Sequence, residues 1–186
     1  NNTVLGVPLD PNGVNNSINA LFVIMFAPVI GLFFVALANR KLEPSSTVKF
    51  GLGFVFLGLG FLTFYSLRFG MDEDGKSSMN VFAAGYLIVT LAELFLSPIG
   101  LSLMTKLAPM RLQGFMMGMW FLASAYGQYV AGLFGASISP EKGADNAQRM
   151  LVYTKGYYDF AWYAIIAGVI LIALYPVIKR LTQEVK

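Results

Sequence analysis

Hydrophobic positions in this chain gather into five runs, and each run is almost free of charged side chains. A helix rises about 1.5 Å per residue, so about 20 residues are needed to cross a hydrocarbon core about 30 Å thick. The runs have that length and are apolar on all sides, which is typical of helices in lipid. We predict transmembrane helices over residues 19–39, 48–67, 81–103, 114–138 and 160–178.

Polar residues, glycines and prolines fill the connections between these runs, as expected of loops at a membrane surface. Residues 40–46 and 139–143 both combine charges with proline. The polar segment 1–17 has neither a basic start nor an apolar core, so it does not read as a signal peptide. We predict an extracytoplasmic loop over 1–17, a helical bundle over 18–182 and a cytoplasmic tail over 183–186.

Composition supports a membrane protein and narrows the possible chemistry. Hydrophobic residues make up 56% of the chain and charged residues 12%, a balance that a soluble domain of 186 residues does not show. The chain has no cysteine and no histidine, which removes disulfides, thiolate metal sites and the usual general base. We therefore expect no metal, no cofactor and no nucleic-acid partner.

The distribution of basic residues gives an orientation. If the runs alternate in direction, eight Lys and Arg side chains fall on one side of the membrane and five on the other. Cytoplasmic loops carry the excess of basic residues, so the C-terminus lies in the cytoplasm and the N-terminus outside. Because the segment 1–17 does not resemble a natural start, we expect earlier helices to precede it.

Glu93 is the only acidic side chain within the five runs. A carboxylate at the centre of a spanning helix costs about 3 kcal/mol on insertion scales, so it normally faces a bundle interior or a water-filled cavity. Tyr86, Thr90, Glu93 and Ser97 share one helical face, and Pro98 is expected to kink the helix directly after them. This stripe is typical of a cavity wall that moves. The alternative is an ion pair that only holds helices together.

The fourth run also carries a polar face, because Trp120, Ser124 and Gln128 follow one another at spacings of four. Together with Phe121, these residues can line an adaptable pocket. A tryptophan can equally face lipid, however, and a glutamine can simply bridge helices. In the first run, Asn19 stands near the outer end, and its position alone favours a helix cap.

Glycines predict close contacts between helices. Gly51 and Gly58 are seven residues apart in the second run, as are Gly53 and Gly60, which suggests a packing groove. In the fourth run a GxxxG pair begins at Gly114, and this spacing allows close backbone approach. We assign these glycines structural roles and no chemistry.

A long stretch of the chain resembles the tenth and eleventh helices of the proton-dependent oligopeptide transporters. It covers residues 93–123 and reads ELFLSPIGLSLMTKLAPMRLQGFMMGMWFLA. Residues 17–24 and 42–51 are similar to that family's eighth and ninth helices, and the last run would be its twelfth. The resemblance covers nearly the whole chain but only the later part of a full transporter.

The resemblance implies a major-facilitator fold, of which this chain would form five transmembrane helices of the C-terminal six-helix bundle. In that fold two bundles rock around a central site, and a proton gradient drives di- and tripeptides inward across the cell inner membrane. It implies a transporter rather than an enzyme. The partners would be small peptides, protons, the lipid bilayer and the missing N-terminal helices. The kink at Pro98 would belong to the inner gate.

The same resemblance implies roles for five residues in substrate binding. Glu93 would receive the ammonium group of the peptide, or a lysine of the other bundle when the site is empty. Asn19 corresponds to an asparagine that binds the peptide backbone, and this favours a substrate-binding role for Asn19 over a role as a helix cap. Trp120 and Phe121 correspond to pocket aromatics, and Ser97 to a small polar residue of the pocket wall.

Some features differ from the family pattern. An alanine follows Asn19 where the family often has proline, and Met110 stands where a basic residue is common. The proton-path motifs of the family's earlier helices have no counterpart in this chain. The short connection 68–80 leaves no room for the large extracellular domain of animal members, which favours a bacterial source.

Three other functions are open at this stage. The nearest is a major-facilitator transporter of another substrate, although an anionic substrate would sit poorly against Glu93. A non-transporting scaffold subunit would use Glu93 only to pair helices. An intramembrane enzyme would need a second catalytic group, and none is visible at membrane depth.

Overall fold

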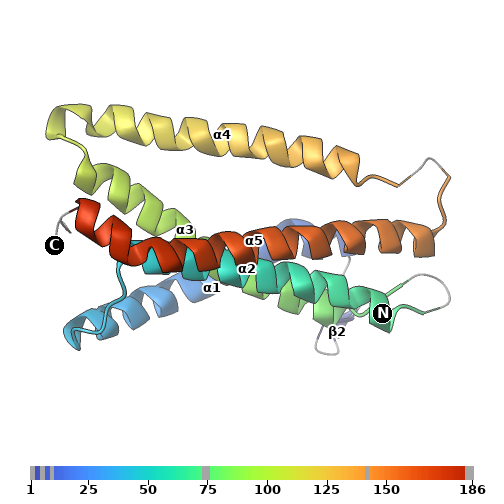
Figure 1. The fold of residues 1–186 in the computed structure, drawn as a ribbon. Helices are drawn as coiled ribbons and strands as arrows, with labels where there is room; N and C mark the ends of the chain where they lie inside the picture. Colours follow the sequence, from blue (N-terminus) through green and yellow to red (C-terminus); the bar gives the residue numbers. More distant parts are fainter. Residues whose placement is uncertain (1–2, 5–6, 9–10, 73–75, 141–142, 183–186) are drawn as a thin grey trace.

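Five long helices dominate the described part of the chain (Figure 1). The computed structural model describes residues 3–4, 7–8, 11–72, 76–140 and 143–182. The helices are α1 (Pro11–Asn39), α2 (Ser46–Ser66), α3 (Met79–Leu107), α4 (Gln113–Ser137) and α5 (Asn146–Thr182). The prediction of an all-α membrane protein is confirmed. The predicted tail and part of the predicted N-terminal loop lie outside the described residues.

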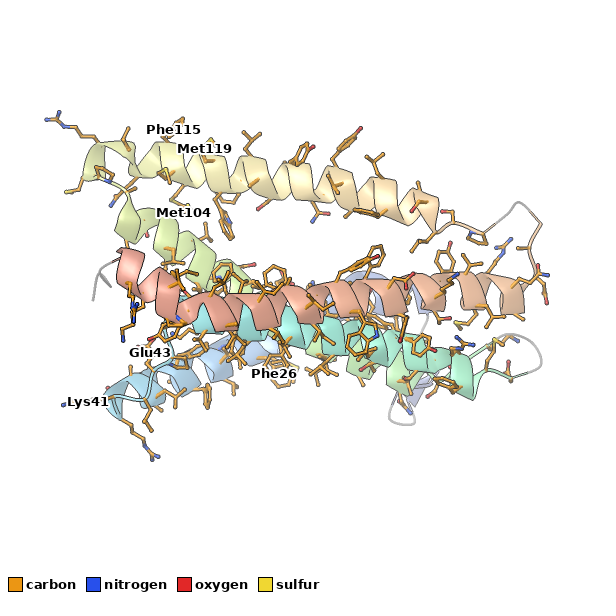
Figure 2. The ribbon with its side chains drawn as sticks, viewed as in Figure 1. Phe26, Lys41, Glu43, Met104, Phe115 and Met119 are labelled. Atoms are coloured by element: carbon orange, nitrogen blue, oxygen red, sulfur yellow. The ribbon has the colours of Figure 1, made fainter. Side chains whose placement is uncertain are left out.

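Short elements join or precede the helices. They are the 3-10 helices η1 (Leu67–Gly70) and η2 (Met110–Leu112) and the antiparallel two-residue strands β1 (Thr3–Val4) and β2 (Val7–Pro8). Successive helices reverse direction, so the α1–α2 loop, the α3–α4 turn and the end of α5 lie at one end of the bundle (Figure 1). Lys41, Glu43 and Met104 mark this end in Figure 2. This is the grouping of loops from which the orientation was predicted.

Four of the described helices are long and apolar enough to cross a membrane. The spans are Ser17–Asn39, Ser46–Gly70, Met79–Lys106 and Asn146–Arg180. The helix that falls short is α4, which was predicted as a span over 114–138. It has sufficient length, but its glycine, serine, glutamine and tyrosine residues lower its hydropathy.

Two helices begin many residues before their apolar runs. α1 begins at Pro11, so residues 11–17 of the predicted loop are helical, and α5 begins well before residue 160. Proline suits the first position of a helix, and a formed helix extends through polar residues at little cost. Packing also supports the start of α5, because Thr154 has no exposed surface and Gly156 lies against Ile138. Hydropathy therefore located the spans but not the polar ends of the helices.

Two glycines of α2 form its contact with α5. A Cβ atom at Gly51 would lie 2.5 Å from Cγ1 of Ile172, and one at Gly58 would lie 2.5 Å from Cγ1 of Ile165. At Gly58 it would also lie 2.7 Å from the carbonyl oxygen of Ala161. The two helices therefore pack so closely that only glycine fits at these positions.

The other two glycines of α2 face α3. A Cβ atom at Gly53 would lie 2.8 Å from the side chain of Leu96, and one at Gly60 would lie 2.5 Å from Val89. The predicted packing groove is therefore confirmed, and it is two-sided. α2 sits between α3 and α5 and forms the centre of the bundle (Figure 1).

The predicted close packing of α4 is not found within the described residues. Apart from the adjoining residues and the backbone of α4 itself, no described atom lies within 4 Å of a Cβ placed at Gly114 or Gly118, and none of the described side chains of α4 is buried. Its contacts include a hydrogen bond that Gln113 donates to the Thr105 carbonyl (3.1 Å), the ring of Trp120 on Gly100, and the ring of Phe134 against Phe160 (5.8 Å between centroids). A glycine pair produces packing only where another helix fills the space above it.

Candidate functional site

A small apolar cluster fixes the first part of α1 against α3. Ile18 of α1 is buried with Met79 and Ala83 of α3, and Phe22 packs against them. Because Asn19 directly follows Ile18, this cluster sets its position beside α3. The polar stripe of α3 begins at this contact.

Three polar side chains meet between α1 and α3. The Asn19 amide donates from Nδ2 to Oε2 of Glu93 at 3.2 Å. Oγ1 of Thr90 lies 2.8 Å from Oδ1 of Asn19 and also 2.8 Å from the carbonyl oxygen of Tyr86. We call Asn19, Thr90 and Glu93 the polar triad.

The triad settles the structural position of Asn19. α1 begins at Pro11, so Asn19 lies inside the helix and the interpretation as a cap is wrong. The backbone N–H groups around an interior helical residue are paired within the helix, so they need no capping side chain. The side chain of Asn19 reaches across to α3 instead. Asn19 is therefore a bridge between two helices.

Burial differs sharply across the triad. Thr90 has no exposed surface, Asn19 is half-buried and Glu93 is exposed. The ion pair found in the described part of the chain joins Lys49 to Glu43 at the other end of α1, and it does not involve Glu93. The carboxylate of Glu93 is thus oriented by a neutral amide and open to a cationic partner.

The polar stripe continues from Glu93 to Ser97 and then to Gly100, where α3 meets Trp120. The indole ring of Trp120 occupies the place of a side chain at Gly100, so even a Cβ atom there would overlap Cη2 of the ring. Gly100 is buried, and Ser97 and Trp120 are half-buried. Gly100 carries no side chain that marks it as a site residue in the sequence, although its spacing of seven from Glu93 places it on the same helical face.

The other predicted site residues do not join the triad. Phe121 is 58% exposed, because the residue after Trp120 points about 100° away around the helix. Ser124 turns its hydroxyl back to the carbonyl of Trp120 at 3.0 Å. α3 is helical through Pro98 without interruption, and Pro98 is exposed. Its role as a hinge stays a prediction.

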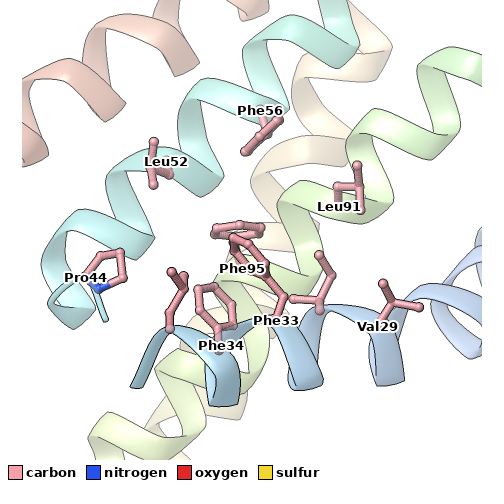
Figure 3. A pocket seen from close by; sticks show the side chains of 10 residues that line it. Val29, Phe33, Phe34, Pro44, Leu52, Phe56, Leu91 and Phe95 are labelled. Carbon is pink, nitrogen blue, oxygen red and sulfur yellow. The ribbon is translucent and has the colours of Figure 1, made fainter. Parts of the chain in front are cut away.

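A cavity of about 480 Å³ lies between α1, α2 and α3, apart from the triad (Figure 3). All of its lining residues are apolar, among them Val29, Phe34, Phe56 and Phe95. The ammonium group of Lys49, which is not among the lining residues, lies 4.3 Å from the ring centroid of Phe34. An apolar wall of this kind offers no partner to the charged ends of a small polar molecule, so the triad is the better candidate site.

Comparison with known families decides the relationship of this chain. Residues 9–146 match the PTR2 profile, which describes the POT family. The chain belongs to the POT family. The matched region includes all three residues of the polar triad, together with Ser97 and Trp120.

Relatives of this POT-family chain include named peptide transporters. It is 41% identical over 128 residues to "Peptide transporter YePEPT" of Yersinia enterocolitica, which covers 68% of this chain and 25% of the relative. It is 28% identical over 180 residues to "Dipeptide and tripeptide permease B" of Aeromonas hydrophila, which covers 96% of this chain and 36% of the relative. These relatives are transporters, and the prediction that the protein is not an enzyme is confirmed.

A solved structure shares the fold. The chain superposes with a TM-score of 0.78 and 32% identity on the structure described as "Crystal structure of peptide transporter POT in complex with sulfate". The match covers 96% of this chain and 33% of that chain. This POT-family chain is a multi-pass membrane protein that spans about a third of the length of that transporter. The major-facilitator fold predicted from the sequence is confirmed.

Proposed function

We propose that this chain supplies part of the substrate site of a symporter that carries di- and tripeptides together with protons across the bacterial cell inner membrane. The observation that carries the proposal is the polar triad: an acidic side chain in an apolar helix is held by a neutral amide and left open. Carboxylates at this depth mark substrate or ion pathways. The peptide-transporter relatives support a peptide as the substrate.

The chemistry of the triad suits the common parts of every short peptide. The carboxylate of Glu93 would bind the ammonium group, whose attraction is stronger in a partly dry cavity than in water. The amide of Asn19 both donates and accepts hydrogen bonds, so it can bind a peptide backbone. In the empty transporter, a lysine from the missing N-terminal helices would pair with Glu93.

The surrounding walls suit variable side chains. Trp120, braced against Gly100, and the more exposed Phe121 would offer apolar surface, and Ser97 a small polar group. One fixed charge with adaptable walls favours a site that accepts many peptides. Pro98 would act as the hinge of alternating access. The proton gradient would supply the energy, so no cofactor is needed, and the C-terminus would face the cytoplasm.

The test is uptake of a labelled dipeptide into proteoliposomes that hold the full-length parent protein, with and without an inward proton gradient. Glu93→Gln keeps the shape of the side chain and removes its charge. We expect gradient-driven uptake in the parent and a rise of at least about 30-fold in KM for the mutant. Leaving the ammonium group without its charged partner costs about 2 kcal/mol or more.

Asp159→Asn is the matched control, because it makes the same carboxyl-to-amide change at an exposed position of α5 away from the triad. Its uptake should equal that of the parent. Unchanged uptake in Glu93→Gln would reduce Glu93 to a residue that pairs helices. An absence of peptide uptake in the parent would indicate another substrate or a scaffold role.

A further inference from the structure

The hydroxyl group of Thr90 has two acceptors but only one proton. Its oxygen lies 2.8 Å from Oδ1 of Asn19 and 2.8 Å from the carbonyl oxygen of Tyr86. A hydroxyl donates one hydrogen bond at a time and accepts through its lone pairs. The two contacts therefore cannot both be donated by Thr90 at the same moment, and the choice between them depends on Asn19.

The amide of Asn19 has two orientations of nearly the same shape, related by exchange of Oδ1 and Nδ2. In the first, Nδ2 donates to the ionised carboxylate of Glu93, and Oδ1 accepts from Thr90, as the distances of 3.2 Å and 2.8 Å show. An amide oxygen turned toward an ionised carboxylate would place two acceptors together. The first orientation thus belongs to ionised Glu93.

In the second orientation every donor again has an acceptor, provided that Glu93 carries a proton. The carboxylic acid donates to Oδ1 of Asn19, and Nδ2 donates to the oxygen of Thr90. Thr90 then donates to the carbonyl of Tyr86, which is already within reach. The proton count balances, because the single proton gained by Glu93 is the one that it donates.

We propose that Thr90 is a positioning residue that couples the orientation of the Asn19 amide to the protonation of Glu93. The proposal rests on the proposed function of Glu93 and Asn19 as the peptide site. Toward Glu93, Asn19 presents N–H groups when the carboxylate is ionised and a carbonyl when it is protonated. The same residue therefore offers the peptide a donor in one protonation state and an acceptor in the other.

Other titratable groups near the triad do not explain such a response. The elements packed against α3 are α1, α2, α4 and β1. Neither β1 nor the part of α1 from residue 17 to its end carries a titratable side chain. The remaining titratable side chains of α2, α3 and α4 are Lys49, Tyr65, Tyr86, Lys106, Tyr126 and Tyr129. Near neutral pH, lysine is cationic and tyrosine is neutral, so neither type changes its charge there. Within these described elements, Glu93 is the acidic group.

Removal of the Thr90 hydroxyl should shift the equilibrium between the two orientations of the Asn19 amide toward the first. The inner end of the Asn19 amide would then lack a partner, and a buried N–H without an acceptor is tolerated less well than a carbonyl without a donor. Asn19 would keep Oδ1 inward and Nδ2 on Glu93. That arrangement favours the ionised carboxylate, so Glu93 would become protonated only at lower pH.

The test compares Thr90→Val, which removes the hydroxyl but keeps the shape, with Thr90→Ser, which retains the hydroxyl. Infrared difference spectra of the full-length transporter without peptide, between alkaline and acidic buffer, report carboxylic-acid bands, and the band lost in Glu93→Gln belongs to Glu93. We expect Thr90→Val to lower the pH midpoint of this band by about one unit. Thr90→Ser should leave it in place.

Two further measurements keep the proposal open to refutation. In an Asn19→Leu background, Thr90→Val should shift nothing, because the coupling passes through the amide. If Thr90→Val does not fold, Thr90→Ala removes the same hydroxyl with less bulk and should give the same downward shift. An unmoved or raised midpoint, or equal shifts in the serine and valine variants, would overturn the proposal. The infrared midpoint needs no peptide, so it decides this point even where peptide uptake fails.

Discussion

α2 and α4 are both rich in glycine, yet within the described residues only the glycines of α2 lie in packing contacts. A Cβ atom at Gly58 of α2 would lie 2.5 Å from Ile165, whereas nothing lies within 4 Å of one at Gly118 of α4. A glycine pattern shows that a helix has a smooth surface. Whether that surface is a contact depends on whether another helix reaches it.

The two helices also differ in what anchors them. α2 is held along its length, with buried glycines facing α5 on one side and α3 on the other. α4 is held mainly near its ends and exposes large aromatic side chains such as Phe115, Tyr126 and Tyr129. The stable core of this chain is therefore the α2, α3 and α5 group, and α4 contributes Trp120 to the site from outside it.

The largest expected effect is at the α2–α5 contact. Gly58→Leu would force α2 away from the Ala161 carbonyl, which is backbone and cannot rotate aside. We expect a loss of about 3 kcal/mol in the free energy of unfolding. The measurement is unfolding of the 186-residue chain in detergent, with Gly118→Leu as the matched control. Equal stability of the two variants would break the distinction between α2 and α4.

A smaller effect is expected where α4 meets α3. Gly100→Ala would displace the Trp120 ring, which is a side chain and can move, so we expect a loss of about 1 kcal/mol. The chain has two tryptophans, so in a Trp162→Phe background the emission reports Trp120 alone. Emission should shift to longer wavelength as the ring gains contact with water. Unshifted emission, as expected for the control Gly132→Ala, would contradict the contact.

The smallest expected effect is a gain on the open face of α4. Gly118→Ala adds a methyl group where space is free and restricts the unfolded chain, so α4 should gain up to about 1 kcal/mol. Hydrogen exchange of the α4 amides in the 186-residue chain would measure this gain. Faster exchange of the α4 amides in Gly118→Ala would show that the added methyl group meets another part of this chain. Destabilisation only in the full-length parent would show that another helix covers this face.

Much of the candidate site could be predicted from local patterns. Glu93 stands out because a carboxylate is rare in an apolar run, and helical periodicity placed Thr90 and Ser97 on its face. The partnership with Asn19 could not be read in this way, because 74 residues separate Asn19 from Glu93. Position alone favoured a cap for Asn19, and only the family resemblance pointed to the site.

The sequence by itself determined the membrane class, the spans of α1, α2, α3 and α5, and the isolation of Glu93. These are local properties, because the thickness of the bilayer and the period of the helix act on each segment separately. Only the tertiary structure decided which glycines are contacts, that Trp120 lies on Gly100, and that one hydroxyl links Asn19 to Tyr86. Those pairings depend on the rotation and offset of one helix against another, which are set by packing between segments far apart in the chain.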